Sequence, residues 1–187
     1  MGNVLNISGD LLLLAALLAG AFFVFARVKA EYKLRRRLSG PVAVLQTGYF
    51  FIYFLCSYAF LDSRLSQVNT KGMLFYFAIV LILTGFLIVM FSMPLLGRRS
   101  FGMKVGGLRT SGIYLYSRNP QLVGSFFFIA GYAMLWPSWQ GFLWAGLWLV
   151  IAHWMVQAEE THLKEVFGDE YRAYCTRTPR YLGLPKK

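Results

Sequence analysis

From Asn119 to Ala158 the chain carries no Asp, Glu, Lys or Arg, an uncharged interval of 40 residues. One helix needs about 20 residues to cross a hydrocarbon core of about 30 Å, so this interval is long enough for two crossings. Its midpoint, Trp136 to Gly141, supplies the proline and glycine of a tight turn and two tryptophans. Tryptophan is enriched at membrane interfaces. The interval therefore predicts a helical hairpin within a membrane.

Three more apolar segments precede this hairpin, and 57% of all residues are hydrophobic while only 14% are charged. Soluble domains have about 25% charged residues, so the composition excludes a soluble nucleic-acid-binding protein and a disordered chain. We predict an all-α integral membrane protein with five transmembrane helices, forming one membrane domain. The expected spans are residues 11–28, 42–61, 72–96, 120–136 and 139–158.

Positive charge gives the expected orientation. Of the 19 Lys and Arg residues, all but Arg64 and Lys71 lie on one side if the chain crosses five times. Positive residues are retained in the cytoplasm, so the amino terminus is expected outside and the carboxyl terminus inside. The net charge of +11 then reports topology, and no nucleic-acid partner is predicted. The residues before Asp10 contain no Lys or Arg, so the apolar stretch after Asp10 lacks the basic leader of a cleaved signal peptide and we expect it to be retained.

The two cysteines, Cys56 and Cys175, do not form the close repeat of a metal site or a redox pair. We predict neither a disulfide nor a metal site.

The predicted hairpin turns on the outside, so both its ends return to the cytoplasmic face. Residues 98–119 and 159–187 flank these ends, and we expect Asn119 and Pro120 to lie near Glu159 and Glu160. Asn119 fits a helix N-cap and Pro120 the first helical position. With Arg118, this helix start could seat a carboxylate or phosphate. The residue types alone favour a simple cap beside an arginine retained in the cytoplasm.

Glu159 and Glu160 stand at the edge of the hydrocarbon, where a carboxylate requires an ion pair or a bound cation. His153, Gln157 and Glu160 recur at helical spacing on one stripe, which we expect to face inward.

Beyond the glutamates, His162 is expected on the wet surface. Apolar residues at helical intervals between Leu163 and Tyr174 predict an amphipathic interfacial helix in the cytoplasmic tail 159–187, broken at Gly168 and Asp169.

These same residues form a longer series that resembles the isoprenylcysteine carboxyl methyltransferase family and its phospholipid-methyltransferase relatives. The matching pattern consists of Leu108, Thr110 to Tyr114, Arg118 to Pro120, Gly124, Glu159, Glu160, Leu163, Phe167 to Tyr171, Tyr174, Pro179 and Arg180. Order, spacing and membrane context agree across the predicted hairpin.

The resemblance implies a membrane methyltransferase that uses S-adenosylmethionine and takes a lipophilic or lipid-modified acceptor from the bilayer at the cytoplasmic side. The acceptor atom could belong to a carboxylate, a thiol or an amine. The residues that the resemblance assigns to the cofactor are Gly106, Gly107, Leu108, Arg109, Tyr114, Arg118, Asn119, Pro120, Gln121, Leu122, Glu159 and Glu160. Arg118, His153, Arg180 and Tyr181 are catalytic candidates by position only, and no general base is assigned.

Two positions depart from the family pattern. The common Arg-His-Pro is here Arg118-Asn119-Pro120, so no imidazole stands at the helix start. Met155 takes the place where the prenylcysteine enzymes carry an arginine for the substrate carboxylate. A thiol, an amine or another lipophilic acceptor is therefore as plausible as a prenylcysteine carboxylate. Two alternative functions stay open: an NADPH-dependent membrane reductase of the sterol-reductase type, and a non-catalytic relative.

Overall fold

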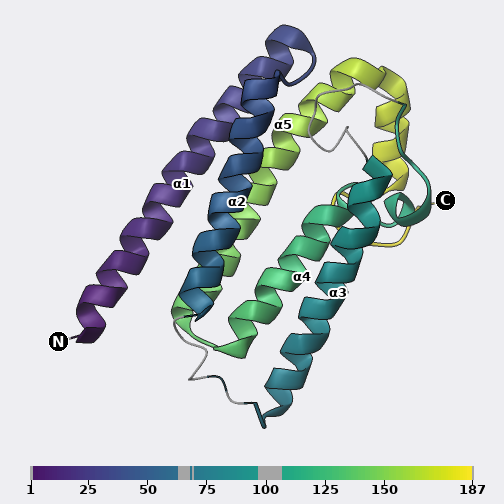
Figure 1. The fold of residues 1–187 in the computed structure, drawn as a ribbon. Coiled ribbons are helices and arrows are strands. Elements are labelled where there is room, and N and C mark those ends of the chain that lie inside the picture. Colours follow the sequence, from purple (N-terminus) through teal and green to yellow (C-terminus); the bar gives the residue numbers. More distant parts are fainter. Residues whose placement is uncertain (1, 63–67, 69, 97–106, 187) are drawn as a thin grey trace.

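The computed structural model describes residues 2–62, 68, 70–96 and 107–186 (Figure 1). In these residues it contains helices and no strand, which confirms the all-α prediction. The elements are α1 (Gly2–Arg35), α2 (Gly40–Asp62), α3 (Met73–Leu96), the 3-10 turn η3 (Gly112–Leu115), α4 (Pro120–Leu135) and α5 (Trp139–Arg177).

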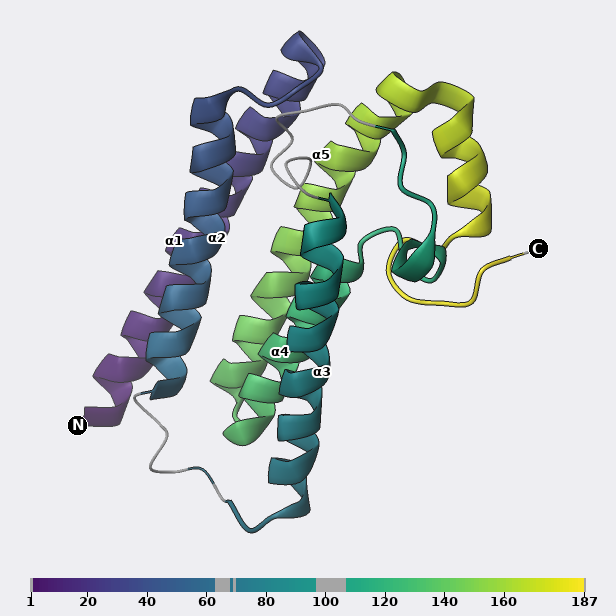
Figure 2. The same cartoon turned by 45° about the vertical axis from the view of Figure 1, so that its right-hand side comes forward.

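Helix α5 joins two pairs of helices, α1 with α2 and α3 with α4. The Tyr49 hydroxyl of α2 donates to the Leu17 carbonyl of α1 over 2.8 Å, and the Tyr53 hydroxyl donates to the Trp144 carbonyl of α5 over 2.7 Å. Both hydroxyls are buried, so these bonds satisfy groups that would be costly in an apolar interior. The view in Figure 2 shows α1 and α2 on one side and α3 and α4 on the other.

Glycines let α3 and α4 approach closely. A Cβ atom added at Gly124 would lie 2.8 Å from the Gly85 carbonyl oxygen, and one at Gly131 would lie 2.7 Å from the Ala78 carbonyl oxygen. Small residues at membrane helix interfaces allow such backbone contact. This pair therefore forms one rigid wall of the bundle.

Four of the five predicted spans are long and apolar enough to cross a membrane by themselves, and the chain is an integral membrane protein. Helix α4 is shorter, because its 16 residues reach only about 24 Å at 1.5 Å per residue. Figure 2 shows that α4 begins well below the upper ends of α2 and α5. The segment that leads into α4 therefore lies beside α5 and below the upper end of the bundle.

The turn between α4 and α5 has the predicted chemistry. Trp136 and Pro137 follow α4, and the Ser138 side chain caps α5 by accepting from the Gly141 N–H over 3.1 Å. The structure therefore confirms the helical hairpin expected from the uncharged interval.

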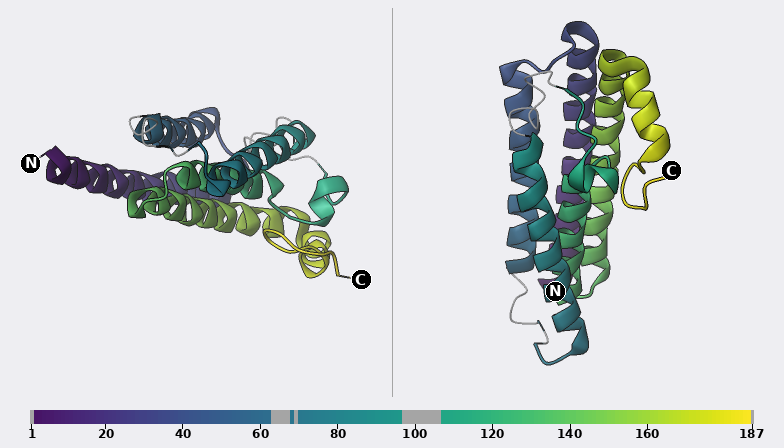
Figure 3. Two further views of the ribbon diagram at one scale, coloured as in Figure 1. Left: turned by 90° about the horizontal axis from the view of Figure 1, so that it is seen from below. Right: turned by 90° about the vertical axis from the view of Figure 1, so that its right-hand side faces the viewer.

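Helix α5 continues past Glu159 and bends at Gly168, where φ is 52° and ψ is −121°. This confirms the predicted break: a second helical segment follows the bend and folds back along the bundle (Figure 3). The segment after α5 is then bonded to the loop before α4: the Gly183 N–H donates to the Tyr116 carbonyl over 3.1 Å.

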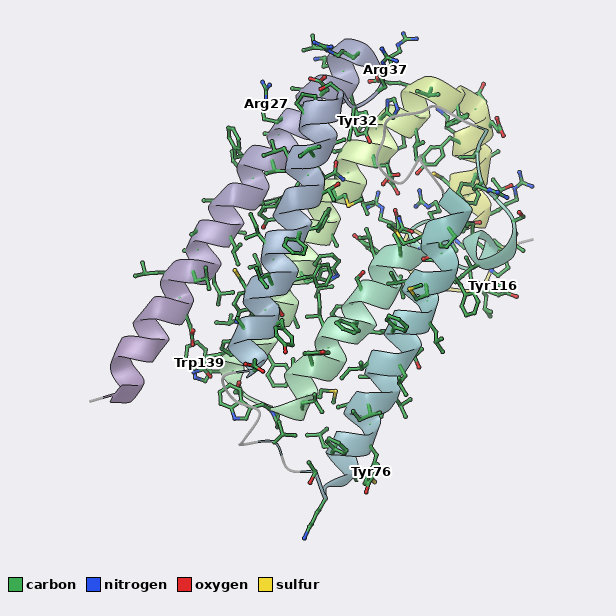
Figure 4. All side chains as sticks on the ribbon, in the orientation of Figure 1. Arg27, Tyr32, Arg37, Tyr76, Tyr116 and Trp139 are labelled. Atoms are coloured by element: carbon green, nitrogen blue, oxygen red, sulfur yellow. The ribbon has the colours of Figure 1, made fainter. Side chains whose placement is uncertain are left out.

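Two labelled arginines lie at one end of the bundle, together with Tyr32. Arg27 and Arg37 lie at the end where α5 bends, whereas Trp139 and Tyr76 lie near the opposite end (Figure 4). Cys56 and Cys175 are both free thiols, as predicted.

Candidate active site

Glu160 is the centre of a buried ion-pair cluster that joins three segments of the chain. Its Oε1 lies 2.8 Å from Arg118 Nη1, and Arg180 binds it in bidentate fashion through Nη2 at 2.7 Å and Nε at 3.0 Å. The glutamate side chain is 5% exposed. Both oxygens of Glu160 are therefore bound by arginines. The contact with Arg118 confirms that the glutamate pair lies beside the start of α4.

The tail is fixed to the start of α4 by further bonds. The Asn119 side-chain amide donates to the Arg180 carbonyl over 2.9 Å, and the Arg118 N–H donates to the Pro179 carbonyl over 3.0 Å. The Tyr174 hydroxyl donates to the Tyr114 carbonyl over 2.7 Å. The folded-back end of α5 and the tail thus form the outer wall of the site.

The predicted anion seat at the helix start is already occupied by protein groups. Asn119 stands at the N-cap position, but its side chain bonds to the tail and does not cap the helix. Arg118 contacts Glu160 and Cys175, and the N–H groups of Leu122 and Val123 donate to the Asn119 carbonyl. A carboxylate could gain these donors only by displacing their present partners, although Arg118 Nε is buried and has no hydrogen-bond partner among the described residues.

Glu159, one residue earlier, lies in a different environment. Its Oε2 is buried and has no hydrogen-bond partner among the described residues. Glu159 lies just beyond the predicted span 139–158, and burial, together with the neighbouring Glu160 carboxylate, raises its pKa from 4.5 to about 7. A buried carboxylate oxygen without a partner favours a group that donates hydrogen bonds or carries positive charge.

Two tyrosines lie within electrostatic reach of Glu159. Burial and the Glu159 carboxylate both raise the pKa of Tyr114, while the Arg109 guanidinium lowers it. Tyr32 comes from α1, and its pKa is likewise raised by burial and by Glu159. Both phenols stay protonated at neutral pH, and the Tyr114 hydroxyl donates to the Ser92 carbonyl of α3 over 3.4 Å.

Glu159 also lines a cavity of about 340 Å³ between α2, α3, α4 and α5. Most of the lining is apolar and aromatic, and the volume falls within the range of small-molecule sites. The residues that line it are Gln46, Thr47, Phe50, Phe54, Phe86, Val89, Met93, Gln121, Leu122, Ser125, Phe128, Trp148, Met155 and Glu159. The cavity can therefore hold an apolar molecule next to a carboxylate.

Both histidines lie elsewhere than predicted. His153 is on the outer face of α5, where its Nε2 lies 2.8 Å from the Gln157 amide nitrogen, so this part of the stripe does not face inward. The helix turns by 100° per residue, and only Glu160 of the three is buried. His162 is buried and stacked on Tyr32, with ring centroids 4.2 Å apart, instead of lying on the wet surface. His153 is therefore not beside Glu159.

The other predicted cofactor residues are divided between the core and the surface. Gly106 lies outside the described residues, while Gly107 and Arg109 are exposed and Leu108 is half-buried. Pro120 and Leu122 are buried at the start of α4, and Gln121 and Leu122 line the cavity. Arg118 and Arg180, two of the catalytic candidates, are both bound to Glu160.

The model of the phospholipid methyltransferase family matches residues 73–170, just over half of the chain, and covers α3, α4 and most of α5. The chain belongs to the phospholipid methyltransferase family. This family includes membrane methyltransferases that resemble isoprenylcysteine carboxyl methyltransferase, in agreement with the resemblance found in the sequence. No curated protein and no solved structure matches the chain.

For this phospholipid methyltransferase family member, the contribution of α2 was not predicted from the sequence. Gln46 and Thr47 line the cavity, although they precede the matched region. Two adjacent polar residues in an apolar span were the available signal, because polar groups inside a membrane are costly and often functional. The sequence also did not indicate that Cys175 contacts Arg118 at 2.7 Å.

Proposed function

We propose that this member of the phospholipid methyltransferase family transfers a methyl group from S-adenosylmethionine to a lipophilic acceptor at the cytoplasmic face of the membrane. The observation that carries the proposal is Glu159, whose buried Oε2 has no partner among the described residues and which stands at an apolar cavity. The carboxylate fits the cofactor, whose ammonium group and ribose hydroxyls are hydrogen-bond donors.

When bound, S-adenosylmethionine supplies a methyl group on a positively charged sulfur. Glu159 would hold the cofactor at the cavity, where the methyl group would be available for in-line displacement by a lone pair of the acceptor. Such a displacement requires alignment of the two reactants and exclusion of water more than a general base.

The chain's own residues would divide these tasks. Glu159 would accept hydrogen bonds from the cofactor, and the aromatic lining, including Phe50 and Trp148, would bind the apolar part of the acceptor and exclude water. Glu160 would act as a positioning residue, because it joins Arg118 at the start of α4 to Arg180 of the tail.

Isothermal titration of the detergent-purified chain with S-adenosylhomocysteine tests the proposal. We expect the wild-type protein to bind and Glu159→Gln to bind about 10- to 100-fold more weakly, since a hydrogen bond to a charged group contributes about 1.5–3 kcal/mol. Glu165→Gln is the matched control, because Glu165 is exposed on the same helix. Equal affinity in wild-type and Glu159→Gln protein would remove Glu159 from the cofactor site.

Thermal unfolding with added ligands distinguishes methyl transfer from the two alternative functions. Stabilisation by S-adenosylhomocysteine but not by NADPH supports methyl transfer, because a ligand that binds only the folded state raises the melting temperature. Stabilisation by NADPH alone would indicate a reductase, and stabilisation by neither would indicate a non-catalytic relative.

A further inference from the structure

The outward face of α5 carries two polar side chains at the depth of the hydrocarbon. His153 and Gln157 lie one turn apart on this face, and both side chains are exposed. At 1.5 Å per residue, His153 lies about 21 Å along the helix from Trp139, where α5 begins. The 16 residues of α4 span about 24 Å, so His153 lies within even the shortest crossing of the bundle.

This pair stands in an otherwise apolar surface. In the described parts of the five predicted spans, His153 and Gln157 are the only exposed amide or imidazole side chains. Leu149 and Val150, one turn before His153, are exposed and apolar. Polar groups are costly in hydrocarbon, and those retained in membrane helices commonly bond to a neighbouring helix. The pair therefore indicates a partner within the membrane.

The bond between the two side chains leaves one group of each unused. The Gln157 amide nitrogen lies 2.8 Å from His153 Nε2, and an amide nitrogen only donates, so the imidazole carries its proton on Nδ1. Among the described residues, nothing binds His153 Nδ1 or Gln157 Oε1. The first is a donor and the second an acceptor. A fitting partner presents one acceptor and one donor at the same depth.

A second copy of the chain meets this requirement. All copies insert in the same orientation, so a two-fold axis along the membrane normal brings two α5 helices together at equal depth. His153 of one copy then donates to Gln157 of the other, and the second copy returns the same bond. An acyl chain has no such groups, and a different protein would need both of them at this depth.

A groove beside the pair provides space for the second copy. It measures about 570 Å³ and lies between α4, α5 and the tail, with His153 in its lining. The rest of the lining is mainly apolar and includes Phe126, Phe127 and Leu182. Apolar side chains of the facing helix would enter this groove and shield the hydrogen bonds from lipid.

We propose that two copies of the chain associate through the outward face of α5, joined by reciprocal hydrogen bonds between His153 and Gln157. The association does not depend on the proposed methyl transfer. It gives His153 a role at an interface between copies in place of a catalytic one.

Förster transfer between donor-labelled and acceptor-labelled copies tests the association in phosphatidylcholine vesicles. The full chain carries its dye at Lys186→Cys in a Cys56→Ser, Cys175→Ser background. Transfer is expected to rise with the protein-to-lipid ratio and to saturate. His153→Leu and Gln157→Leu should each need about a 10-fold higher ratio for half-maximal transfer, because either change removes both reciprocal bonds. Gln140→Leu, near the other end of α5, is the matched control and should leave transfer unchanged.

A mixture of the two variants gives a sharper test. In a mixed pair, His153 of the Gln157→Leu copy still faces Gln157 of the His153→Leu copy, so one of the two bonds is kept. The mixture should therefore associate about threefold more tightly than either variant alone. Association that neither substitution weakens would overturn the proposal. Absence of transfer at every ratio would also overturn it and would indicate that lipid covers the pair.

Disulfide cross-linking tests the same face without changing the pair. In the same cysteine-free background, Leu149→Cys should form disulfide-linked dimers in native membranes, because Leu149 lies one turn from His153 on the outward face. Leu83→Cys is the matched control, since Leu83 of α3 is 56% exposed and Leu149 is 51% exposed. The control should stay monomeric. Cross-linking of both variants, or of neither, would contradict the assigned face.

Discussion

Glu159 and Glu160 are neighbours in sequence but have opposite roles in the structure. Successive side chains on a helix differ by 100° in direction, so Glu160 reaches Arg118 and Arg180 while Glu159 lines the cavity. One carboxylate is fully paired within the protein, and the other retains a buried, unpaired oxygen. A pair of identical residues can therefore supply both a structural and a ligand-binding group.

The raised pKa of Glu159 predicts how cofactor binding depends on pH. Its pKa of about 7 means that the carboxyl group is mostly neutral at pH 6 and mostly ionised at pH 8. The cofactor's ammonium prefers the ionised form, so affinity for S-adenosylhomocysteine should increase about 10-fold over this range. Titration calorimetry at several pH values measures this. Glu159→Gln should give a flat profile, and a flat wild-type profile would contradict the assignment.

Glu160 gives a prediction about stability. Glu160→Gln leaves two arginines without their carboxylate, and breaking a buried ion pair costs about 3–5 kcal/mol. We expect lower thermal stability and faster tryptic cleavage at the tail, which would be released from α4.

The control for this change is Asp169→Asn. It breaks the ion pair between Asp169 and Arg172, in which the Arg172 side chain is 72% exposed and the Asp169 side chain 93% exposed. Such surface pairs contribute about 0–1 kcal/mol. Similar effects of both substitutions would show that the Glu160 cluster does not fix the tail.

At the level of elements, the bend of α5 depends on Gly168. Its φ of 52° with ψ of −121° is a backbone conformation that a residue with a Cβ adopts only at a cost of about 1–3 kcal/mol. Gly168→Ala should therefore lower the melting temperature and favour a straighter α5. Electron–electron distance measurements between spin labels on α3 and the tail would detect the movement.

Gly146→Ala is the matched control for Gly168→Ala. Gly146 lies within α5 and does not have the positive φ of Gly168. An added Cβ there would meet no neighbouring group within 4 Å. Alanine favours a helix interior by about 0.5–1 kcal/mol, so this variant should be as stable as the wild type or more so. Equal behaviour of the two variants would contradict a conformational role for Gly168.

Elements were more predictable than side-chain directions. The turn at Trp136 to Gly141 and the break at Gly168 could be predicted because proline and glycine act locally. The direction of the His153 side chain could not be predicted, because an apolar membrane helix has no polar face that indicates which side points inward. The cavity needed tertiary structure, since Gln46 and Glu159 come from distant helices and meet only after packing.

At the scale of the whole molecule, the distribution of positive charge predicts which end faces the cytoplasm. In a Cys56→Ser, Cys175→Ser background, a membrane-impermeant maleimide applied to intact cells should label Gln140→Cys but not Lys186→Cys. Permeabilised cells are the control, because both sites should then react. Labelling of both sites in intact cells would contradict the topology expected from the positive-inside rule.

The short reach of α4 has a consequence for the surrounding lipid. Its apolar length of about 24 Å is less than the hydrocarbon thickness of about 30 Å, and a bilayer adapts to such a mismatch by thinning locally. With the topology expected from the positive charges, the cytoplasmic leaflet beside α4 would then be drawn toward the midplane. Under the proposed function, a lipophilic acceptor in this depression would have a shorter path to the cavity that Glu159 lines.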